Sequence, residues 1–167
     1  NIDLNSIKKN KKITIIYRNK DIQENKEDFY KFRKLCKLKK FKFYVSNQIK
    51  LFKACRADGL YISSYNKKIY LNKNLKLIGS AHSFKEIAEK IKQGCKTIFL
   101  SRLFETSYEN KRGYLGVVKF NLIIEKYNVS IVPLGGIRSS NLNKLNLVNS
   151  VGFGLLSETK KKPAIAS

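Results

Sequence analysis

Short apolar runs alternate with longer amphipathic segments along the 167-residue chain. The runs are rich in β-branched and aromatic residues, which favours strands at Lys12–Tyr17, Phe41–Ser46, Gly59–Ser63, Leu75–Ser80, Lys96–Ser101, Val129–Gly135 and Val151–Ser157. Between several of them, apolar residues recur every three or four positions, which predicts helices at Glu24–Leu38, Gln48–Cys55, Ser83–Gln93, Val117–Tyr127 and Ser139–Leu147. Ser83, with Glu86 three residues on, has the spacing of a capping box. This alternation favours a parallel sheet built from βαβ units.

The order of elements predicts a single α/β domain over residues 1–167, and two architectures suit it. A closed (β/α)8 TIM barrel needs eight strands and usually about 200 residues or more, so seven strands leave one missing. Because the chain starts at Asn1 rather than Met, we expect an N-terminal truncation, with the first strand upstream and Asn1–Asn10 as the remains of the first helix. An open doubly wound sheet is the alternative, but its usual phosphate fingerprint does not follow Tyr17. The truncated barrel is therefore the preferred prediction, with a gap beside the strand Lys12–Tyr17.

The composition is strongly basic, with 35 Lys and Arg against 12 Asp and Glu and a formal charge of +23. Such a charge attracts phosphate groups, and nucleic acid is one candidate partner. However, Lys outnumbers Arg 29 to 6, which is the bias that AT-rich codons would give. The cations are also spread along the whole chain. The densest stretch, Lys31–Lys42, places apolar residues near one helical face and most cations on the other, which is typical of a solvated outer helix. We therefore expect no specific nucleic-acid partner, and the apolar runs are too short to span a membrane.

Three widely spaced cysteines, Cys36, Cys55 and Cys95, form neither a CxxC pair nor a Cys/His ligand pattern. Their odd number and their spacing favour reduced, partly buried thiols. No secretory signal opens the chain. Together these features predict a cytoplasmic protein.

The candidate chemistry lies where the predicted strands end, which is the end of a barrel at which active sites form. Gly135-Gly136 follows a strand and precedes a helix, so its backbone N–H groups can approach an anion, although a simple tight turn is an equal alternative. Leu156-Ser157 ends the last strand and is expected to form the other half of this phosphate cradle.

Polar loops follow two other predicted strands. The loop Arg102–Gly113 holds hydroxyls, among them Thr106, and the cation Lys111, which suits an anionic ligand, an exposed connection being the alternative. Arg18 and Lys20 direct two cations at the same edge. The single histidine, His82, is expected to be structural and to bond backbone near the start of its helix.

Seven short segments, in chain order, resemble the thiamine phosphate synthase/TenI family of (β/α)8 barrels. They are YRNK (Tyr17–Lys20), VSNQIKL (Val45–Leu51), ADGLYI (Ala57–Ile62), SAHS (Ser80–Ser83), LFET (Leu103–Thr106), LGGI (Leu134–Ile137) and GFGLLS (Gly152–Ser157). The family's counterparts are QLRDK, INDRVDL, ADGVHL, STHS, VFPT or VFET, IGGI and GVAVVS. Each segment is short, but seven in the correct order cover nearly the whole chain.

The resemblance implies an enzyme that joins an aminopyrimidine diphosphate to a thiazole phosphate, through a pyrimidine methyl cation that the thiazole nitrogen captures. It implies that Arg18 and Lys20 hold the diphosphate and that Ser80 lies near the aminopyrimidine. The residues that it implies for the thiazole phosphate are Thr106, Lys111, one of Gly135 and Gly136, and Leu156 with Ser157. Ser46 stands where the family has a substrate-site Asn.

Several positions depart from the family pattern. The family holds Mg²⁺ with two aspartates, and this chain has Asn47 and Asn66 there, which implies that Mg²⁺ is held weakly or is lost, because amides bring no negative charge. Arg102 stands where the aromatase-type TenI members have His, and Glu109 where Lys is expected. Two hypotheses therefore stay open: a synthase with a diverged, partly metal-independent diphosphate site, and a TenI-like paralogue that binds a thiazole or thiamine phosphate with little or no turnover.

Overall fold

The computed structural model describes residues 8, 12–18, 26–72, 74–106 and 113–155. Its strands are β1 (Thr14–Tyr17), β2 (Lys42–Ser46), β3 (Gly59–Ile62), β4 (Leu77–Ala81), β5 (Thr97–Ser101) and β6 (Ser130–Leu134). Its helices are α1 (Lys26–Leu38), α2 (Ile49–Ala54), α3 (Phe84–Lys92), α4 (Gly116–Ile124) and the 3₁₀ helix η1 (Ser139–Leu147). All five helices that the sequence predicts are therefore present, the last as a tighter 3₁₀ helix.

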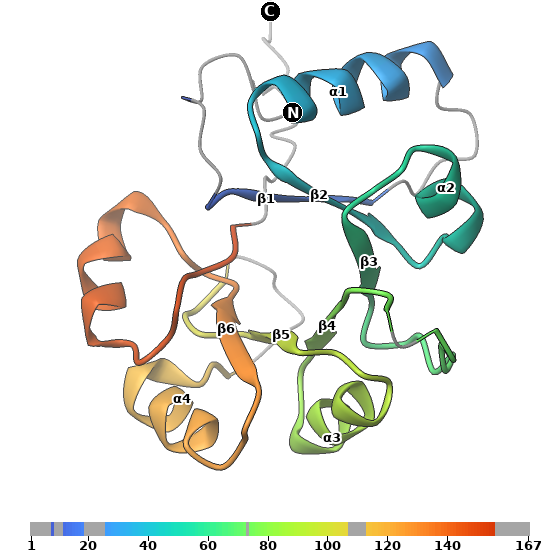
Figure 1. The fold of residues 1–167 in the computed structure, drawn as a ribbon. Coiled ribbons are helices and arrows are strands. Elements are labelled where there is room, and N and C mark those ends of the chain that lie inside the picture. Colours follow the sequence, from blue (N-terminus) through green and yellow to red (C-terminus); the bar gives the residue numbers. More distant parts are fainter. Residues whose placement is uncertain (1–7, 9–11, 19–25, 73, 107–112, 156–167) are drawn as a thin grey trace, which may run out of the picture.

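The strands form one parallel sheet in the order β1-β2-β3-β4-β5-β6. The sheet curls around a central axis, and the helices lie outside it (Figure 1). A doubly wound sheet reverses its strand order at one point, whereas this order follows the sequence throughout. The observed architecture is thus a curled six-stranded parallel sheet, in which the described residues pair β1 with β2 alone.

Of the seventh predicted strand, Val151–Ser157, the described residues 151–155 form one parallel bridge, between Leu134 and Gly154. The backbone N–H of Gly154 donates to the carbonyl of Pro133 at 2.9 Å, so the chain does return beside β6. A Cβ atom at Gly154 would lie only 2.8 Å from the Leu134 side chain, which explains the need for glycine at this approach. Glycines at 152 and 154 also weaken a strand, and Leu156 and Ser157 lie outside the described residues.

Alternate residues of the strands face opposite sides of the sheet. On the helix side, two apolar clusters form the core, one centred on Phe43 and Val45 against α1, the other on Leu60 and Ile98 against α3 and α4. The concave side carries a smaller, mainly aromatic layer made of Tyr44, Tyr61 and Ile78, with Ile16 and Phe99 packed against it. The concave side is therefore lined by rings at the depth of the strand centres.

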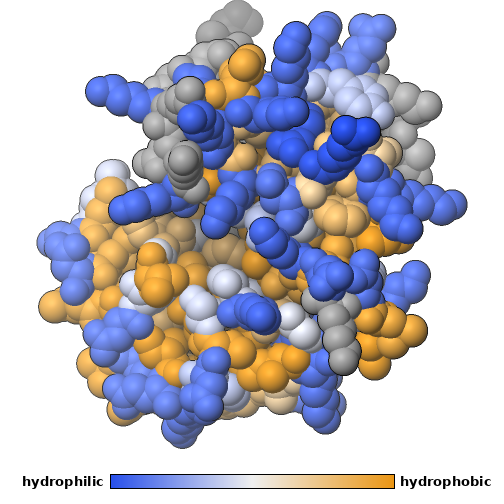
Figure 2. Space-filling view, in the orientation of Figure 1, coloured by the Kyte–Doolittle hydropathy of each residue, from blue (hydrophilic) through white to orange (hydrophobic). Residues whose placement is uncertain are grey.

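Helix α1 shows the amphipathic pattern expected of it, with Phe29 and Cys36 buried against the sheet. Its cations are largely exposed, and the face of the molecule around α1 is predominantly hydrophilic (Figure 2). Arg33 differs from that pattern, because its guanidinium lies over the Phe43 ring, 4.9 Å from the centroid, and donates to the carbonyl of Arg56 at 2.8 Å. Among the helices described, none has the length and apolar character needed to cross a membrane.

Candidate functional site

Polar side chains form a layer above the aromatic residues, at the carboxyl edge of the sheet. Each comes two positions after a residue of the concave layer, so it faces the same side. These residues are Arg18, Ser46, Ser63, Ser80 and Ser101. The guanidinium of Arg18 lies 5.7 Å from the centroid of the Tyr61 ring, so this cation is directed over the concave side. The carboxyl edge thus offers hydroxyl groups and a cation above an aromatic floor.

Asn47 and Asn66, the two positions at which the family has aspartates, lie in contact. The Asn66 side-chain amide donates to Oδ1 of Asn47 at 2.9 Å. The same oxygen accepts from the backbone N–H of Ser63 at 3.1 Å, and Nδ2 of Asn47 donates to Oγ of Ser63 at 2.8 Å. Oδ1 of Asn66 accepts from the backbone N–H of Lys68 at 2.8 Å. The pair therefore joins the end of β2 to the segment after β3.

These contacts decide how well the pair suits Mg²⁺. A magnesium ion favours carboxylate oxygens in an octahedral arrangement, and both side chains here are neutral. Their amide oxygens already accept hydrogen bonds from protein donors. Within the described segments, no three His, Cys, Asp or Glu side chains lie close enough together to hold a metal ion. The residues present at this position consequently do not fit the ion as two aspartates would.

Ser80 and His82 lie at the end of β4, next to the end of β5. Ser80 is buried, and the imidazole Nδ1 of His82 lies 2.8 Å from Oγ of Ser101. The sequence predicts a structural His82 that bonds backbone near the start of its helix, whereas Nδ1 of its ring contacts a side chain across the two strands. Its backbone N–H does bond at the helix start, donating to the Glu86 carboxylate at 2.6 Å. Ser83 caps α3 as predicted, accepting from the backbone N–H of Glu86 at 3.2 Å.

A second group of predicted residues meets beyond β5 and β6. Nη1 of Arg102 donates to Oγ1 of Thr106 at 2.8 Å. A Cβ atom at Gly135 would lie 3.0 Å from Cγ of Arg102, so the arginine stem packs directly on this glycine. In the sequence, Arg102 begins the polar loop that suits an anionic ligand and stands where TenI has His, and the structure adds it to the candidate phosphate residues. Its signal in the sequence was a cation immediately after a strand.

The glycine turn has the backbone conformation that an anion cradle needs. Gly135 and Gly136 have φ angles of 90° and 71°, which favour glycine. A Cβ atom at Gly136 would overlap the carbonyl oxygen of Phe104, so glycine is also required for space. Asn141 braces the turn from η1, since its side-chain amide donates to the Gly136 carbonyl at 2.8 Å. Both carbonyls of the turn accept hydrogen bonds, that of Gly135 from the backbone N–H of Phe104 and that of Gly136 from Asn141.

The structure thus groups the predicted site residues into two halves. Arg18, Ser46, Asn47 and Asn66 come from the ends of β1 to β3. Thr106, Gly135 and Gly136 meet beyond β5 and β6, and Ser80 lies between the halves on β4. The remaining predicted residues, Lys20, Lys111, Leu156 and Ser157, lie outside the described residues.

Comparison with known proteins gives a consistent set of relatives. The sequence model of a family described as thiamine monophosphate synthase matches residues 5–158. A thiamine-phosphate synthase of Prochlorococcus marinus is 25% identical over 141 residues, which are 81% of this chain and 40% of that protein. A thiamine-phosphate synthase of Clostridium acetobutylicum is 25% identical over 139 residues, covering 78% of this chain and 66% of the relative. The chain therefore spans less than half of the first of these proteins and about two thirds of the second.

One solved structure extends the comparison to the fold. The thiamine phosphate pyrophosphorylase of Pyrococcus furiosus superposes with a TM-score of 0.68 at 21% identity. The match covers 86% of this chain and 71% of that one. The curled parallel sheet is thus a fold that this enzyme also has.

Proposed function

This chain belongs to the thiamine monophosphate synthase family, and from that premise we propose that it couples an aminopyrimidine diphosphate to a thiazole phosphate, forming thiamine phosphate and pyrophosphate. The observation that carries the proposal is the meeting of Arg102, Thr106 and the Gly135-Gly136 turn at one edge of the sheet. A guanidinium, a hydroxyl and backbone N–H groups are together the donors that hold a phosphate monoester. Phosphorylated small molecules are accordingly the proposed partners.

We also propose that the curled sheet is the larger part of a (β/α)8 barrel. Sequential strand order with all helices outside supports this, since it is the order in which such a barrel is built. The bridge at Gly154 would then mark the strand that follows β6. The buried free thiols of the described cysteines suit the cytosolic location proposed for this biosynthetic step.

The reaction would proceed in two steps at the carboxyl edge. The bond between the pyrimidine methylene carbon and oxygen breaks, and the electron pair leaves with pyrophosphate, which Arg18 and Lys20 are proposed to bind. The thiazole nitrogen then donates its lone pair to the methylene cation and forms the C–N bond. Ser80 is proposed to hold the aminopyrimidine between the two phosphate sites. Each of these residues is proposed to bind or orient a reactant. The positive charges of Arg18 and Lys20 would balance the negative charge of the departing pyrophosphate.

Because Asn47 and Asn66 do not fit Mg²⁺, we propose that this synthase depends on the ion weakly or not at all. A second candidate function, a TenI-like protein that binds thiazole phosphate or thiamine phosphate without turnover, is favoured by the same neutral pair. Loss of two carboxylates removes negative charge next to the diphosphate, which aids binding of an anion but also removes the family's means of holding a metal.

One experiment separates the two. The chain would be incubated with both substrates, with Mg²⁺ or with EDTA, and thiamine phosphate would be measured by thiochrome fluorescence while pyrophosphate is measured independently. Equal formation of both products, only modestly raised by Mg²⁺, supports the synthase. Binding of thiazole phosphate by calorimetry without product supports the TenI-like protein, and neither binding nor product contradicts both.

A further inference from the structure

A lysine of α3, Lys90, is buried completely on the helix side of the sheet. Its aliphatic stem passes against Gly79, where a Cβ atom would lie 3.0 Å from Cδ of Lys90. Its ammonium donates to two neutral oxygens, the carbonyl of Asn66 at 2.7 Å and Oε1 of Gln93 at 2.8 Å. Burial lowers the pKa of Lys90, as expected for an ammonium held away from water. Burying an ammonium whose partners are neutral costs free energy, because the charge leaves water without meeting an opposite charge. The presence of Lys90 at this position therefore needs a structural explanation.

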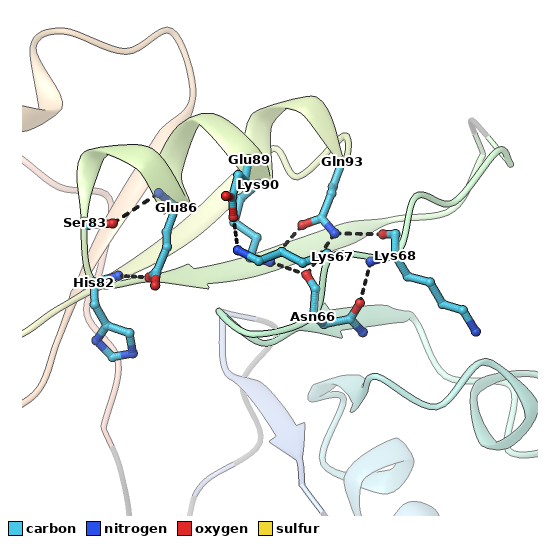
Figure 3. A network of polar contacts seen from close by, with 9 residues as sticks. All are labelled: Asn66, Lys67, Lys68, His82, Ser83, Glu86, Glu89, Lys90 and Gln93. Carbon is cyan, nitrogen blue, oxygen red and sulfur yellow. Dashed lines mark hydrogen bonds and ion pairs between the residues drawn. The ribbon is translucent and has the colours of Figure 1, made fainter.

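Gln93, also on the helix side, acts on the same segment. Its side-chain amide donates to the carbonyl of Asn66 at 3.0 Å and to that of Lys68 at 2.7 Å. Figure 3 shows Lys90 and Gln93 reaching together from the helix toward Asn66 and Lys68, with an ion pair between Glu89 and Lys67 beside them. The segment that contains Asn66 and Lys68 has no regular secondary structure, so these hydrogen bonds fix its position against α3.

The two sides of Asn66 therefore serve different purposes. Its carbonyl faces α3 and accepts from Lys90 and Gln93, while its side chain donates to Asn47 in the candidate site. A change in the position of the carbonyl moves the side chain with it, because both belong to one residue. The buried pair on α3 is thus connected to the carboxyl edge through a single backbone unit.

We propose that Lys90 and Gln93 are positioning residues of the diphosphate half of the site, which hold Asn66 against Asn47 from behind. The proposal rests on the proposed function for the name of that half, and on the hydrogen bonds for the clamp itself. A bound ion would hold the side chains at positions 47 and 66 together. Here the Lys90 ammonium and the Gln93 amide hold Asn66 in position instead.

The test compares Lys90→Met, which keeps the buried stem and removes the donor, with Lys68→Met, which removes an equal charge from the exposed segment that Lys90 contacts. Calorimetry would give the affinities for inorganic pyrophosphate and for thiazole phosphate, and the melting temperature would confirm that each variant folds. Lys90→Met should weaken pyrophosphate binding about tenfold, because Asn66 loses one of the charged hydrogen bonds that hold it in position, and should leave thiazole phosphate binding within about twofold. Lys68→Met should leave both affinities within about twofold.

A second measurement does not depend on a ligand. In ¹H–¹⁵N spectra, the Asn66 side-chain amide should exchange slowly in the wild type and faster in Lys90→Met and in Gln93→Leu, the second variant serving if the first fails to fold. Unchanged exchange and unchanged pyrophosphate affinity in folded variants would overturn the clamp, even if the melting temperature fell. A wild type that binds neither ligand would overturn the proposed function and the assignment to a diphosphate half, while amide exchange would still test the clamp.

Discussion

At the scale of single residues, the Asn47–Asn66 contact shows how much chemistry changes with one atom in each side chain. The amide of Asn66 supplies the hydrogen that fills the 2.9 Å gap to Oδ1 of Asn47. Two carboxylates at the same separation would repel unless a proton or a cation lay between them. The neutral pair is therefore stable by itself, whereas the acidic pair of the family needs a third partner.

The double substitution Asn47→Asp with Asn66→Asp should accordingly create a divalent cation site. Without metal, the melting temperature of the variant relative to that of the wild type should be lower at neutral pH than at pH 4, because one carboxyl must stay protonated to avoid repulsion. Mn²⁺ should raise that temperature and lose its free-ion EPR signal, and Mg²⁺ should stimulate thiamine phosphate formation more than in the wild type. Asn66→Ser is a control that should bind neither ion, and equal Mn²⁺ binding by this control would contradict the prediction.

The cysteines should be unreactive in the folded chain. Cys36 and Cys95 are buried, and burial raises the pKa of each to about 11. A rise of about two units lowers the thiolate fraction at neutral pH about 100-fold. Labelling with Ellman's reagent should therefore be slow in native protein and immediate in denaturant. Rapid labelling of either residue under native conditions would show that the helix side of the sheet opens readily.

Residues such as Thr106, Gly135 and Gly136 could be located from the sequence, because strand ends and glycine pairs are visible in it. Arg102 and Lys90 could not be assigned in the same way. The approach of Arg102 to Thr106 depends on the course of a loop. A lysine in an amphipathic helix is ordinarily expected to be exposed, so the sequence does not predict that Lys90 is buried. The stem of Lys90 lies against Gly79, where a Cβ atom would crowd it, and the sequence pattern does not show this contact.

At the scale of elements, the turn after β6 gives the sharpest test of the phosphate half. Gly136→Asp should weaken thiazole phosphate binding by more than about tenfold, through lost space and like-charge repulsion. It should also destabilise the fold by at least about 1 kcal/mol, since φ is positive at this position. Calorimetry and thermal melts would measure the two effects.

Gly152→Ala is the matched control, because a Cβ atom there meets nothing within 4 Å. It should change neither the affinity nor the melting temperature appreciably. Equal losses from both glycine substitutions would mean that affinity depends on overall stability rather than on the turn.

The elements themselves follow the sequence pattern closely, and the differences have physical causes. Apolar periodicity locates α1 and α3 well, since each buries one face. The segment Val151–Ser157 shows the pattern of a strand, but its described residues pair with β6 through a single bridge at Gly154, and glycines at 152 and 154 weaken a strand. Strand length in this region depends on tertiary contact, which the pattern does not contain.

At the scale of the whole molecule, the charge of +23 makes a prediction about nucleic acids. If the charge is mainly compositional, DNA and RNA should bind weakly, without sequence preference, and the affinity should fall steeply as salt rises. Fluorescence anisotropy with oligonucleotides from 50 to 300 mM salt would measure the slope. Tight, sequence-selective binding that persists near physiological salt would require a dedicated nucleic-acid surface.

The sequential pairing of the strands has a consequence for how the molecule opens. The helix-side apolar contacts divide into one cluster shared by β1, β2, α1 and α2 and another shared by β3 to β6, α3 and α4. Phe52 of α2 packs against both clusters, so the two clusters meet at this helix. The chain should therefore behave as two cooperative units joined at one seam, rather than as a single all-or-none unit. Native-state hydrogen exchange in rising denaturant should make amides of α1 and β2 converge on a lower opening free energy than those of β4 and β5, and one common isotherm for all four would contradict it.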